Sequence, residues 1–200
     1  AEEKDDYFVA ASFLAPYKRT DLVIRAFNEM PWLRLKVVGE GQQSQALRAI
    51  AGPNITFTGY LDRHDFVRTI ARARAMVFAG CEDFGITLAE AQASGTPLIA
   101  FGRGGATDIV RPLGRSARPT GILFHEQSVS AVRAAVERFE HNCGRISPSA
   151  CRANAERFRV ERFHREMRAI VDAAVEAQDG GPRALATSWT GTTELAGRGL

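Results

Sequence analysis

The sequence predicts an α/β protein built on a doubly wound parallel sheet, because strand-like and helical patterns alternate along it. Short apolar runs of four to seven residues recur up to residue 124, and amphipathic helical patterns lie between them. Repeated strand-helix-strand units favour right-handed crossovers and parallel pairing. The candidate strands are 7–11, 33–39, 55–59, 75–79, 97–101 and 121–124.

The connecting helices are predicted from apolar stripes and from capping signals. Apolar residues recur at helical spacing over 23–30 and again over 129–139. Asp62, followed three residues later by Asp65, has the pattern of an N-cap and its capping partner. Gly95 stands where the helix before strand 97–101 should end.

The domain organisation follows from length and from the end of the periodic patterns. A chain of 200 residues suits one domain, which buries roughly 70% of the surface that its unfolded form exposes. We expect this domain to span 1–178 and to end with a helix from about Val160 to Ala177. Residues 179–200 are rich in glycine and threonine and lack a period, so we expect a disordered tail.

Composition and charge narrow the classes of protein. The net charge is +3 and the pI is near 9.0, but arginines alternate with glutamates over 133–168, which indicates solvated helix faces and no nucleic-acid partner. No apolar run is long enough to span a bilayer, and the acidic N-terminus is unlike a signal peptide. The three cysteines and four histidines show no ligand spacing. We therefore expect a cytoplasmic protein without a metal site.

Ligands of doubly wound sheets bind beyond the carboxyl ends of the strands, so the loops there are the candidate sites. The loop after 7–11 delivers Lys18 and Arg19 to the start of a helix, although solvated side chains would also explain them. The loop after 33–39 contains Gly39 and Gly41, which allow the backbone to approach a ligand.

The loop after 75–79 carries the strongest chemical signal. Glu82 lies in it, and Phe84, Gly85 and Ile86 begin a helix whose free N–H groups and dipole favour a phosphate. An acid at a helix N-terminus explains Glu82 without any ligand. Glu90 lies inside a nearly apolar helix, so it must reach solvent in a cleft or hold polar partners.

In this order the segments resemble the family 4 retaining glycosyltransferases. The similarity runs from Tyr7 to about Ala177 and is carried by YFVAAS, APYKRTDLVIRAFN, LKVVGEG, NITFTGYL, EDFGITLAEAQASGTPLIAFGRGGA and TGILF. The resemblance implies the GT-B fold, of which this chain is similar to the C-terminal, Rossmann-like half that holds the nucleotide-sugar donor. It is most similar to bacterial mannosyltransferases of surface polysaccharide and lipid-linked oligosaccharide synthesis. This similarity implies GDP-mannose as the first candidate for the donor and a UDP-sugar as the second.

The resemblance also implies a role for each matching residue. Lys18 would contact the diphosphate with Arg19 beside it, Glu82 would bind the sugar hydroxyls, and Glu90 would bind the ribose hydroxyls. Lys18 and Glu82 would be the catalytic residues. Backbone groups would complete the donor site at Gly39, Gly41, Tyr60, Leu61, Phe84, Gly85 and Ile86.

Retaining transfer breaks the bond between C1 of the sugar and its phosphate, and fixed positive groups lower the barrier by meeting the leaving diphosphate. The resemblance implies no metal and no cofactor, and it places the acceptor site in an N-terminal domain missing from this chain. It allows peripheral association of the full enzyme with the inner face of the membrane. Phe13 stands where many family members have a second arginine for the diphosphate, and Asp108 where many have glutamate.

Other classes of protein remain open at the level of sequence. Gly39-x-Gly41-x-x-Ser44, with Asp62 further on, imitates the fingerprint of an NAD(P)-binding Rossmann domain. Ser44 replaces its third glycine, and the motif lies on the second strand. The chain could also be a non-catalytic module that binds a nucleotide-sugar. If such a module pairs with a partner subunit, we expect exposed apolar patches at the cleft and on the last helix.

Overall fold

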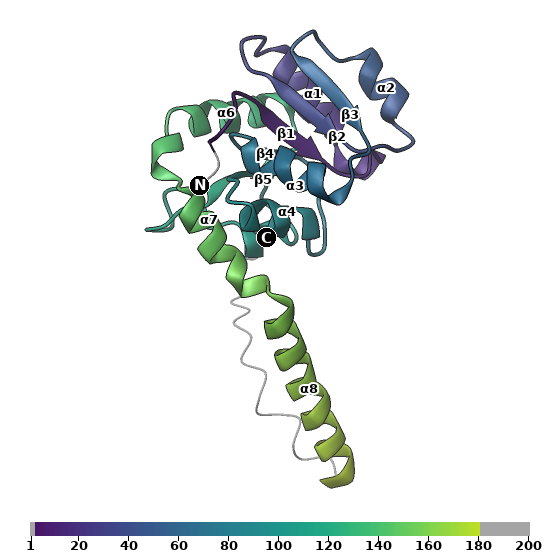
Figure 1. Cartoon of the computed structure of the whole chain (residues 1–200), viewed down its shortest axis with the longest axis vertical. Helices are drawn as coiled ribbons and strands as arrows, with labels where there is room; N and C mark the ends of the chain where they lie inside the picture. The colour runs from purple at the N-terminus through teal and green to yellow at the C-terminus, as the bar shows by residue number, and fades with distance from the viewer. Residues whose placement is uncertain (1–2, 181–200) are drawn as a thin grey trace, which may run out of the picture. The chain divides into compact units, whose positions relative to one another are not determined.

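A sheet of six parallel strands organises the chain. Figure 1 shows the sheet with helices around it. The computed structural model describes residues 3–180. The strands lie in the order β3-β2-β1-β4-β5-β6. Their bounds are β1 Phe8–Ala11, β2 Leu35–Val38, β3 Ile55–Gly59, β4 Met76–Phe78, β5 Leu98–Phe101 and β6 Gly121–Phe124. Each lies within a range predicted from sequence, and the predicted Rossmann-like α/β class is confirmed.

The strand order changes direction between β1 and β4. Val9 of β1 pairs with Lys36 of β2 on one side and with Met76 of β4 on the other. The chain leaves β1 toward β2 but leaves β4 toward β5. The two following loops therefore diverge, and this divergence opens a crevice beyond the carboxyl ends of the two strands.

Helices follow the strands in alternation. In chain order they are η1 Pro16–Lys18, α1 Thr20–Asn28, α2 Ser44–Ala49, α3 Arg63–Arg72, α4 Ile86–Ala93, α5 Ala106–Ile109, α6 Val129–Glu140, η2 Cys143–Arg145, α7 Pro148–Ala155 and η3 Glu156–Phe158. Helix α1 packs against α6, and α4 packs against α7. Asp62 caps α3 by accepting a hydrogen bond from the Asp65 N–H, as predicted.

The core lies between the sheet and the helices α1 and α6. The Phe8 ring meets Phe27 edge-on at 5.4 Å and Phe139 at 5.8 Å between centroids, and all three side chains are buried. Burying a side chain of this size contributes roughly 1.5–3 kcal/mol. The apolar stripe predicted for 23–30 supplies this face of α1, because Val23, Ala26, Phe27 and Met30 are all buried.

A buried polar network fixes α4 on α7. Gln92 of α4 donates from Nε2 to the Thr120 carbonyl at 3.0 Å. Asn154 of α7 donates from Nδ2 to Gln92 Oε1 at 3.0 Å and to the Ile109 carbonyl at 2.6 Å. Buried amides that are satisfied in this way specify one arrangement of their helices. The network therefore holds the helix that carries the candidate site.

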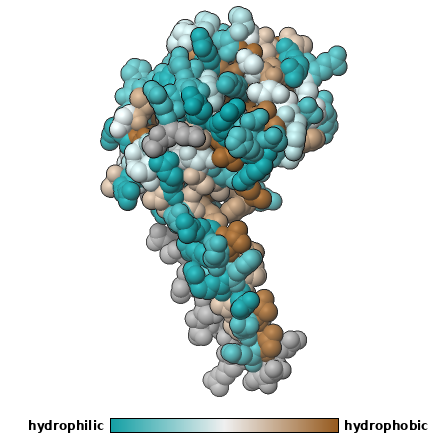
Figure 2. Space-filling view, viewed as in Figure 1, coloured by the Kyte–Doolittle hydropathy of each residue, from teal (hydrophilic) through white to brown (hydrophobic). Residues whose placement is uncertain are grey.

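The contacts within the chain divide it into a unit that ends at Arg157 and a second unit that begins at Phe158. Helix α8 (Val160–Gly180) forms the described part of the second unit beyond η3. Its exposed apolar stripe is visible in Figure 2. The stripe consists of Val160, Phe163, Met167, Ile170, Val171 and Val175. Of the predicted tail, residues 181–200 lie outside the described residues, and the extent of the domain stays a prediction.

Within the described residues, no helix combines the length and the apolar character that crossing a bilayer requires.

Candidate functional site

A pocket of about 560 Å³ opens where β1 and β4 end, and we call it the switch-point pocket. The loop after β1 forms one wall, and the loop after β4 with the first turn of α4 forms the other. Its lining consists of residues 11–13, 17–18, 78 and 81–88. The position matches the crevice that the strand order creates, which is where doubly wound sheets bind ligands.

Lys18 and Glu82 meet across this pocket. Lys18 ends η1, and its ammonium forms an ion pair with Glu82 Oε1. The Lys18 side chain is 11% exposed and that of Glu82 is 24% exposed, so both are mostly withdrawn from water. The ammonium also lies over the Tyr17 ring, 4.7 Å from its centroid. The two residues predicted to be catalytic are therefore in contact, although their chain positions are far apart.

The N-terminus of α4 presents unused hydrogen-bond donors to the same pocket. Gly85 is the N-cap residue in the left-handed conformation (φ 87°), and no side chain caps the helix. The N–H groups of Ile86 and Thr87 donate no hydrogen bond within the described part of the chain. Because a helix N-terminus carries a partial positive charge, an anion is favoured at this point.

The glycines after β2 support the first wall of the pocket. A Cβ on Gly41 would lie within 2.5–2.8 Å of backbone atoms of Leu14. Gly39 meets Ser12 in the same way, with 2.0 Å to its carbonyl oxygen. In the structure these glycines allow a close approach to the loop after β1, and the predicted approach to a ligand stays a prediction. Ser44, the third position of the dinucleotide-like motif, accepts from the Gly41 N–H at 3.0 Å.

The glycines after β5 support the second wall. The Gly105 N–H donates to the Glu82 carbonyl at 2.7 Å. A Cβ on Gly105 would lie 1.9 Å from the Phe84 carbonyl oxygen, which no side chain can occupy. The loop carrying Glu82 therefore rests directly on the backbone of the next strand's loop. This contact explains why a glycine is needed at position 105 of the GRGG segment, which the sequence did not reveal.

Glu90 lies two residues beyond Leu88, which is the last residue of α4 in the pocket lining. Its Oε1 accepts from Arg63 Nη1 at 2.6 Å, and its side chain is 30% exposed. Arg63, at the start of α3, is thus a partner of Glu90 that the sequence did not indicate. Its position directly after the Asp62 cap places it near the carboxyl end of β3, which was the available signal.

Other predicted residues also lie outside the lining. Arg19 has a left-handed backbone, precedes α1, and donates from Nε to Asp21 Oδ1 at 3.2 Å. Tyr60 is 78% exposed and its N–H donates to Glu40 Oε1 at 3.4 Å, with half-buried Leu61 beside it. The structure therefore brings Lys18, Glu82, Phe84, Gly85 and Ile86 together in one pocket.

Several lining residues were not predicted as site residues. Ser12, Tyr17, Asp83 and Thr87 were missed, although each lies within or next to a loop whose position at a strand end was recognised. Phe13, which stands where the resemblance implies an arginine, also lines the pocket. Among the described residues of this lining, Lys18 is the single lysine or arginine, while Glu82 and Asp83 are acids. Of the described groups, Lys18 and the start of α4 are the ones that would attract an anion in this pocket.

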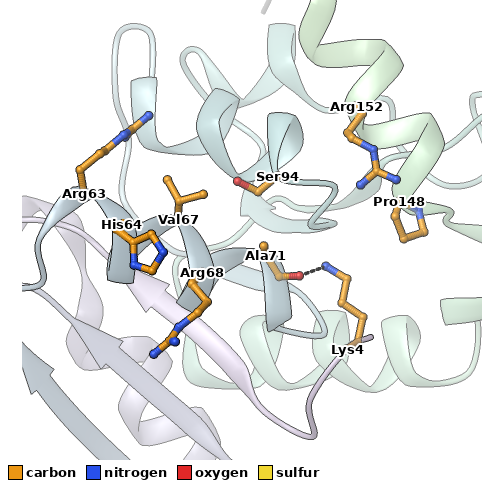
Figure 3. A pocket seen from close by; sticks show the side chains of 9 residues that line it. All are labelled: Lys4, Arg63, His64, Val67, Arg68, Ala71, Ser94, Pro148 and Arg152. Atoms are coloured by element: carbon orange, nitrogen blue, oxygen red, sulfur yellow. Dashed lines mark hydrogen bonds between the residues drawn. The ribbon is translucent and has the colours of Figure 1, made fainter. Parts of the chain in front are cut away.

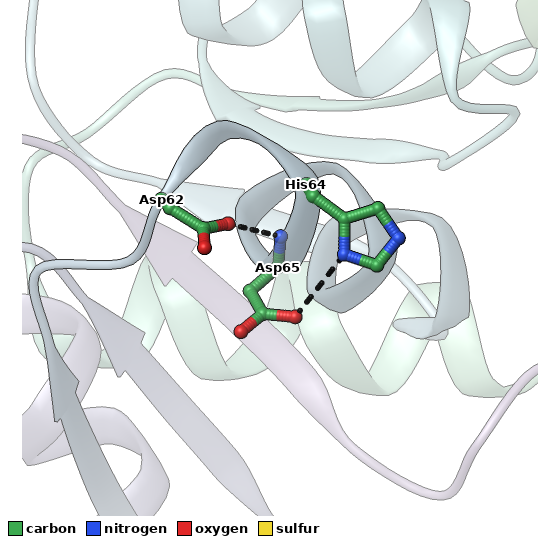
Figure 4. A group of neighbouring side chains, drawn as sticks. All are labelled: Asp62, His64 and Asp65. Atoms are coloured by element: carbon green, nitrogen blue, oxygen red, sulfur yellow. Dashed lines mark hydrogen bonds and ion pairs between the residues drawn. The ribbon is translucent and has the colours of Figure 1, made fainter.

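Figure 4 shows a group of potential metal ligands that the sequence did not single out. Ligand atoms of Asp62, His64 and Asp65 lie within 4.8 Å of one another. Asp62 Oδ1 accepts from the Asp65 N–H at 2.8 Å, and His64 Nδ1 lies 3.4 Å from Asp65 Oδ1. Capping of α3 explains this arrangement, so the group gives no reason to assign a metal.

The fold and the pocket define a Rossmann-like domain with a crevice at its topological switch point. Residues 1–158 match the family model described as "Glycosyl transferases group 1". The chain belongs to this family, which confirms the family resemblance found in the sequence.

Individual relatives are longer than this chain. A GDP-mannose-dependent monoacylated alpha-(1-6)-phosphatidylinositol monomannoside mannosyltransferase of Corynebacterium glutamicum is 34% identical over 116 residues, which is 50% of this chain and 30% of that protein. The pneumococcal O-GlcNAc transferase GtfA, solved with UDP and GlcNAc, matches 86% of this chain and 36% of its own (TM-score 0.71, 22% identity). Anabaena HepE, solved with UDP-glucose, matches 84% of this chain and 49% of its own (TM-score 0.71, 20% identity). The chain thus spans about a third to a half of these proteins.

Proposed function

We propose that the protein acts as a glycosyltransferase and that its switch-point pocket binds the diphosphate and the sugar of a nucleotide-sugar donor. One observation carries this proposal. Lys18 and the unused N–H groups of Ile86 and Thr87 line the same pocket as the carboxylate of Glu82. Cationic and N–H donors suit the diphosphate, and a carboxylate that accepts hydrogen bonds suits sugar hydroxyls.

The chemistry then follows from the placement of these groups. When the bond between C1 and the phosphate oxygen breaks, negative charge grows on the leaving diphosphate. Lys18 and the start of α4 are fixed before the reaction and meet that charge without reorganisation, which lowers the barrier. Glu82 leaves Lys18 when the donor enters and accepts hydrogen bonds from the sugar.

Glu90 is proposed to bind the ribose of the donor. It lies four residues after Ile86, which is about 6 Å along the helix axis. A ligand that extends from the start of α4 along this helix reaches it. Arg63 must then share Glu90 with the ribose hydroxyls or move aside, because it holds Glu90 Oε1 in the structure.

The donor and the second half of the enzyme are inferred from the relatives. We propose GDP-mannose as the donor, because the mannosyltransferase relative of C. glutamicum is GDP-mannose-dependent. A UDP-sugar is the next candidate, because two fold neighbours were solved with UDP or UDP-glucose. The acceptor site is proposed to lie outside this chain, which spans less than half of those neighbours.

The test is calorimetric titration of the protein with GDP-mannose, UDP-glucose and NAD. We expect a nucleotide-sugar to bind and NAD not to bind. Lys18→Ala and Glu90→Ala should each weaken donor binding by more than about 1 kcal/mol, the scale of a lost charged hydrogen bond.

Lys36→Ala is the matched control, since it removes a lysine that lies over the Tyr7 ring outside the pocket lining. Affinity that stays unchanged in both site variants would refute the site assignment. Binding of NAD in preference to every nucleotide-sugar would refute the proposed function itself.

A further inference from the structure

A second hollow lies between α3, the end of α4 and α7, and we call it the α3–α7 groove. Figure 3 shows Arg63, His64 and Arg68 of α3 on one side of it and Arg152 of α7 with Lys4 on the other. Its volume is about 700 Å³, and it shares no lining residue with the switch-point pocket. It is therefore a separate hollow, which is connected to the proposed ribose-binding residue Glu90 through Arg63.

The groove is lined by basic residues and by no described aspartate or glutamate. Arg63 is engaged by Glu90, and Arg68 Nη2 lies 3.5 Å from Asp65 Oδ1. Arg152 has no carboxylate within ion-pair distance among the described residues. Its guanidinium lies over Gly95, where a Cβ would be only 2.2 Å from Nη1. Gly95, read from the sequence as a helix stop alone, thus also leaves room for this cation.

Lys4 adds a second cation on the same side of the groove. Its Nζ donates to the Ala71 carbonyl at 2.7 Å and to Thr96 Oγ1 at 3.0 Å, and these two acceptors fix the position of the ammonium. The Ser94 hydroxyl lines the groove as well. An anion placed here would meet Arg152, Lys4 and a hydroxyl donor, which are the groups that recognise phosphate.

The remaining surface of the groove is apolar. Val67 and Ala71 of α3 and Pro148 at the start of α7 contribute it. Val67 is 36% exposed, although it is a large hydrophobic residue. A free inorganic anion would leave this surface in contact with water. A ligand that joins a phosphate to a short apolar group would use both parts of the groove.

We propose that the α3–α7 groove binds a phosphate ester that carries an apolar group. The phosphate lies between Arg152 and Lys4, and the apolar group lies against Val67 and Ala71. A soluble ester and the headgroup of an anionic phospholipid share this chemistry. The proposal does not require the proposed donor site, because neither Arg152 nor Lys4 lines the switch-point pocket.

The test is calorimetric titration of the protein with hexyl phosphate and, separately, with inorganic phosphate. Hexyl phosphate should bind saturably and at least about tenfold more tightly, because each buried CH2 adds affinity. Arg152→Gln should weaken hexyl phosphate binding by about tenfold, the effect of losing one charged hydrogen bond. Thermal melting of each variant establishes that it is folded.

Introducing a negative charge in the apolar part provides a matched pair of variants. Val67→Glu places a carboxylate in the groove and should abolish binding, whereas Val67→Gln has the same size without charge and should keep binding within about threefold. Absence of saturable binding, or equal affinity in the native protein and in Arg152→Gln and Val67→Glu, would overturn the proposal.

Vesicles distinguish the two sources of the ligand. If a lipid headgroup is bound, phosphatidylglycerol vesicles should sediment the protein, phosphatidylcholine vesicles should not, and Val67→Glu should abolish sedimentation. If a free ester is bound, hexyl phosphate binds and vesicles of neither lipid sediment the protein. Sedimentation that Val67→Glu leaves intact, without binding of hexyl phosphate, contradicts the groove as the site.

Discussion

The contact between Lys18 and Glu82 predicts opposite effects of two neutralising substitutions on the binding of a nucleoside diphosphate that lacks the sugar. Glu82 places a carboxylate in the pocket that we propose for the diphosphate, and it forms an ion pair with Lys18, the cation proposed to bind that diphosphate. Lys18→Gln removes attraction, whereas Glu82→Gln removes repulsion and frees Lys18. Affinity should fall in the first variant and rise in the second.

The magnitudes follow from burial and charge. Two unit charges about 4 Å apart interact by about 4 kcal/mol at an effective dielectric constant near 20, before solvent screening. Because the Lys18 and Glu82 side chains are 11% and 24% exposed, screening is incomplete, and measured charged hydrogen bonds of about 1.5–3 kcal/mol set the scale. We expect Lys18→Gln to weaken binding by about 2 kcal/mol, about 30-fold, and Glu82→Gln to strengthen it by about 1 kcal/mol, about fivefold.

Calorimetric titration with GDP and with GDP-mannose, in the native protein and both variants, measures these effects. In Glu82→Gln, GDP should gain affinity while the additional affinity contributed by mannose is lost. The double variant tests whether the two residues act as a pair, because independent residues would give additive changes. Equal weakening of GDP binding by both substitutions would refute the reasoning, since the carboxylate would then assist the diphosphate.

The other predictions concern three separate features. Gly105→Ala should displace the loop of Phe84, whose carbonyl lies 1.9 Å from the added Cβ, and lower both the melting temperature and donor affinity measured by calorimetry. Phe13→Arg adds a cation to the pocket lining and should strengthen diphosphate binding by about 1 kcal/mol, with Phe13→Met as the uncharged control. Burial raises the pKa of the Cys151 thiol to about 12, so iodoacetamide should modify the two exposed cysteines and spare Cys151 in the native protein. Because its ordinary pKa is 9.0, the unfolded chain loses this proton first, and the free energy of unfolding should fall as pH rises from 9.0 toward 12.

The sequence by itself determined the positions of the strands and helices and most of the loop that carries Glu82. Strand ranges, the Asp62 cap and the stop at Gly95 depend on neighbours in the chain, and such local patterns are legible without a structure. Glu82 and Gly85 were placed in a functional loop for the same reason, because a strand end followed by a helix start is a local signal.

The tertiary structure alone decided which loops meet. Lys18 and Glu82 share a pocket because β4 pairs with β1, and nothing local in either segment specifies that pairing. Arg63 reaches Glu90, and Gly105 supports the Phe84 loop, through the packing of elements that are distant in sequence. The α3–α7 groove also depends on helix packing, which brings together basic residues from distant segments. No single segment of the sequence indicates this groove. Periodicity encodes what a segment becomes, whereas strand order and helix packing decide which side chains it will face.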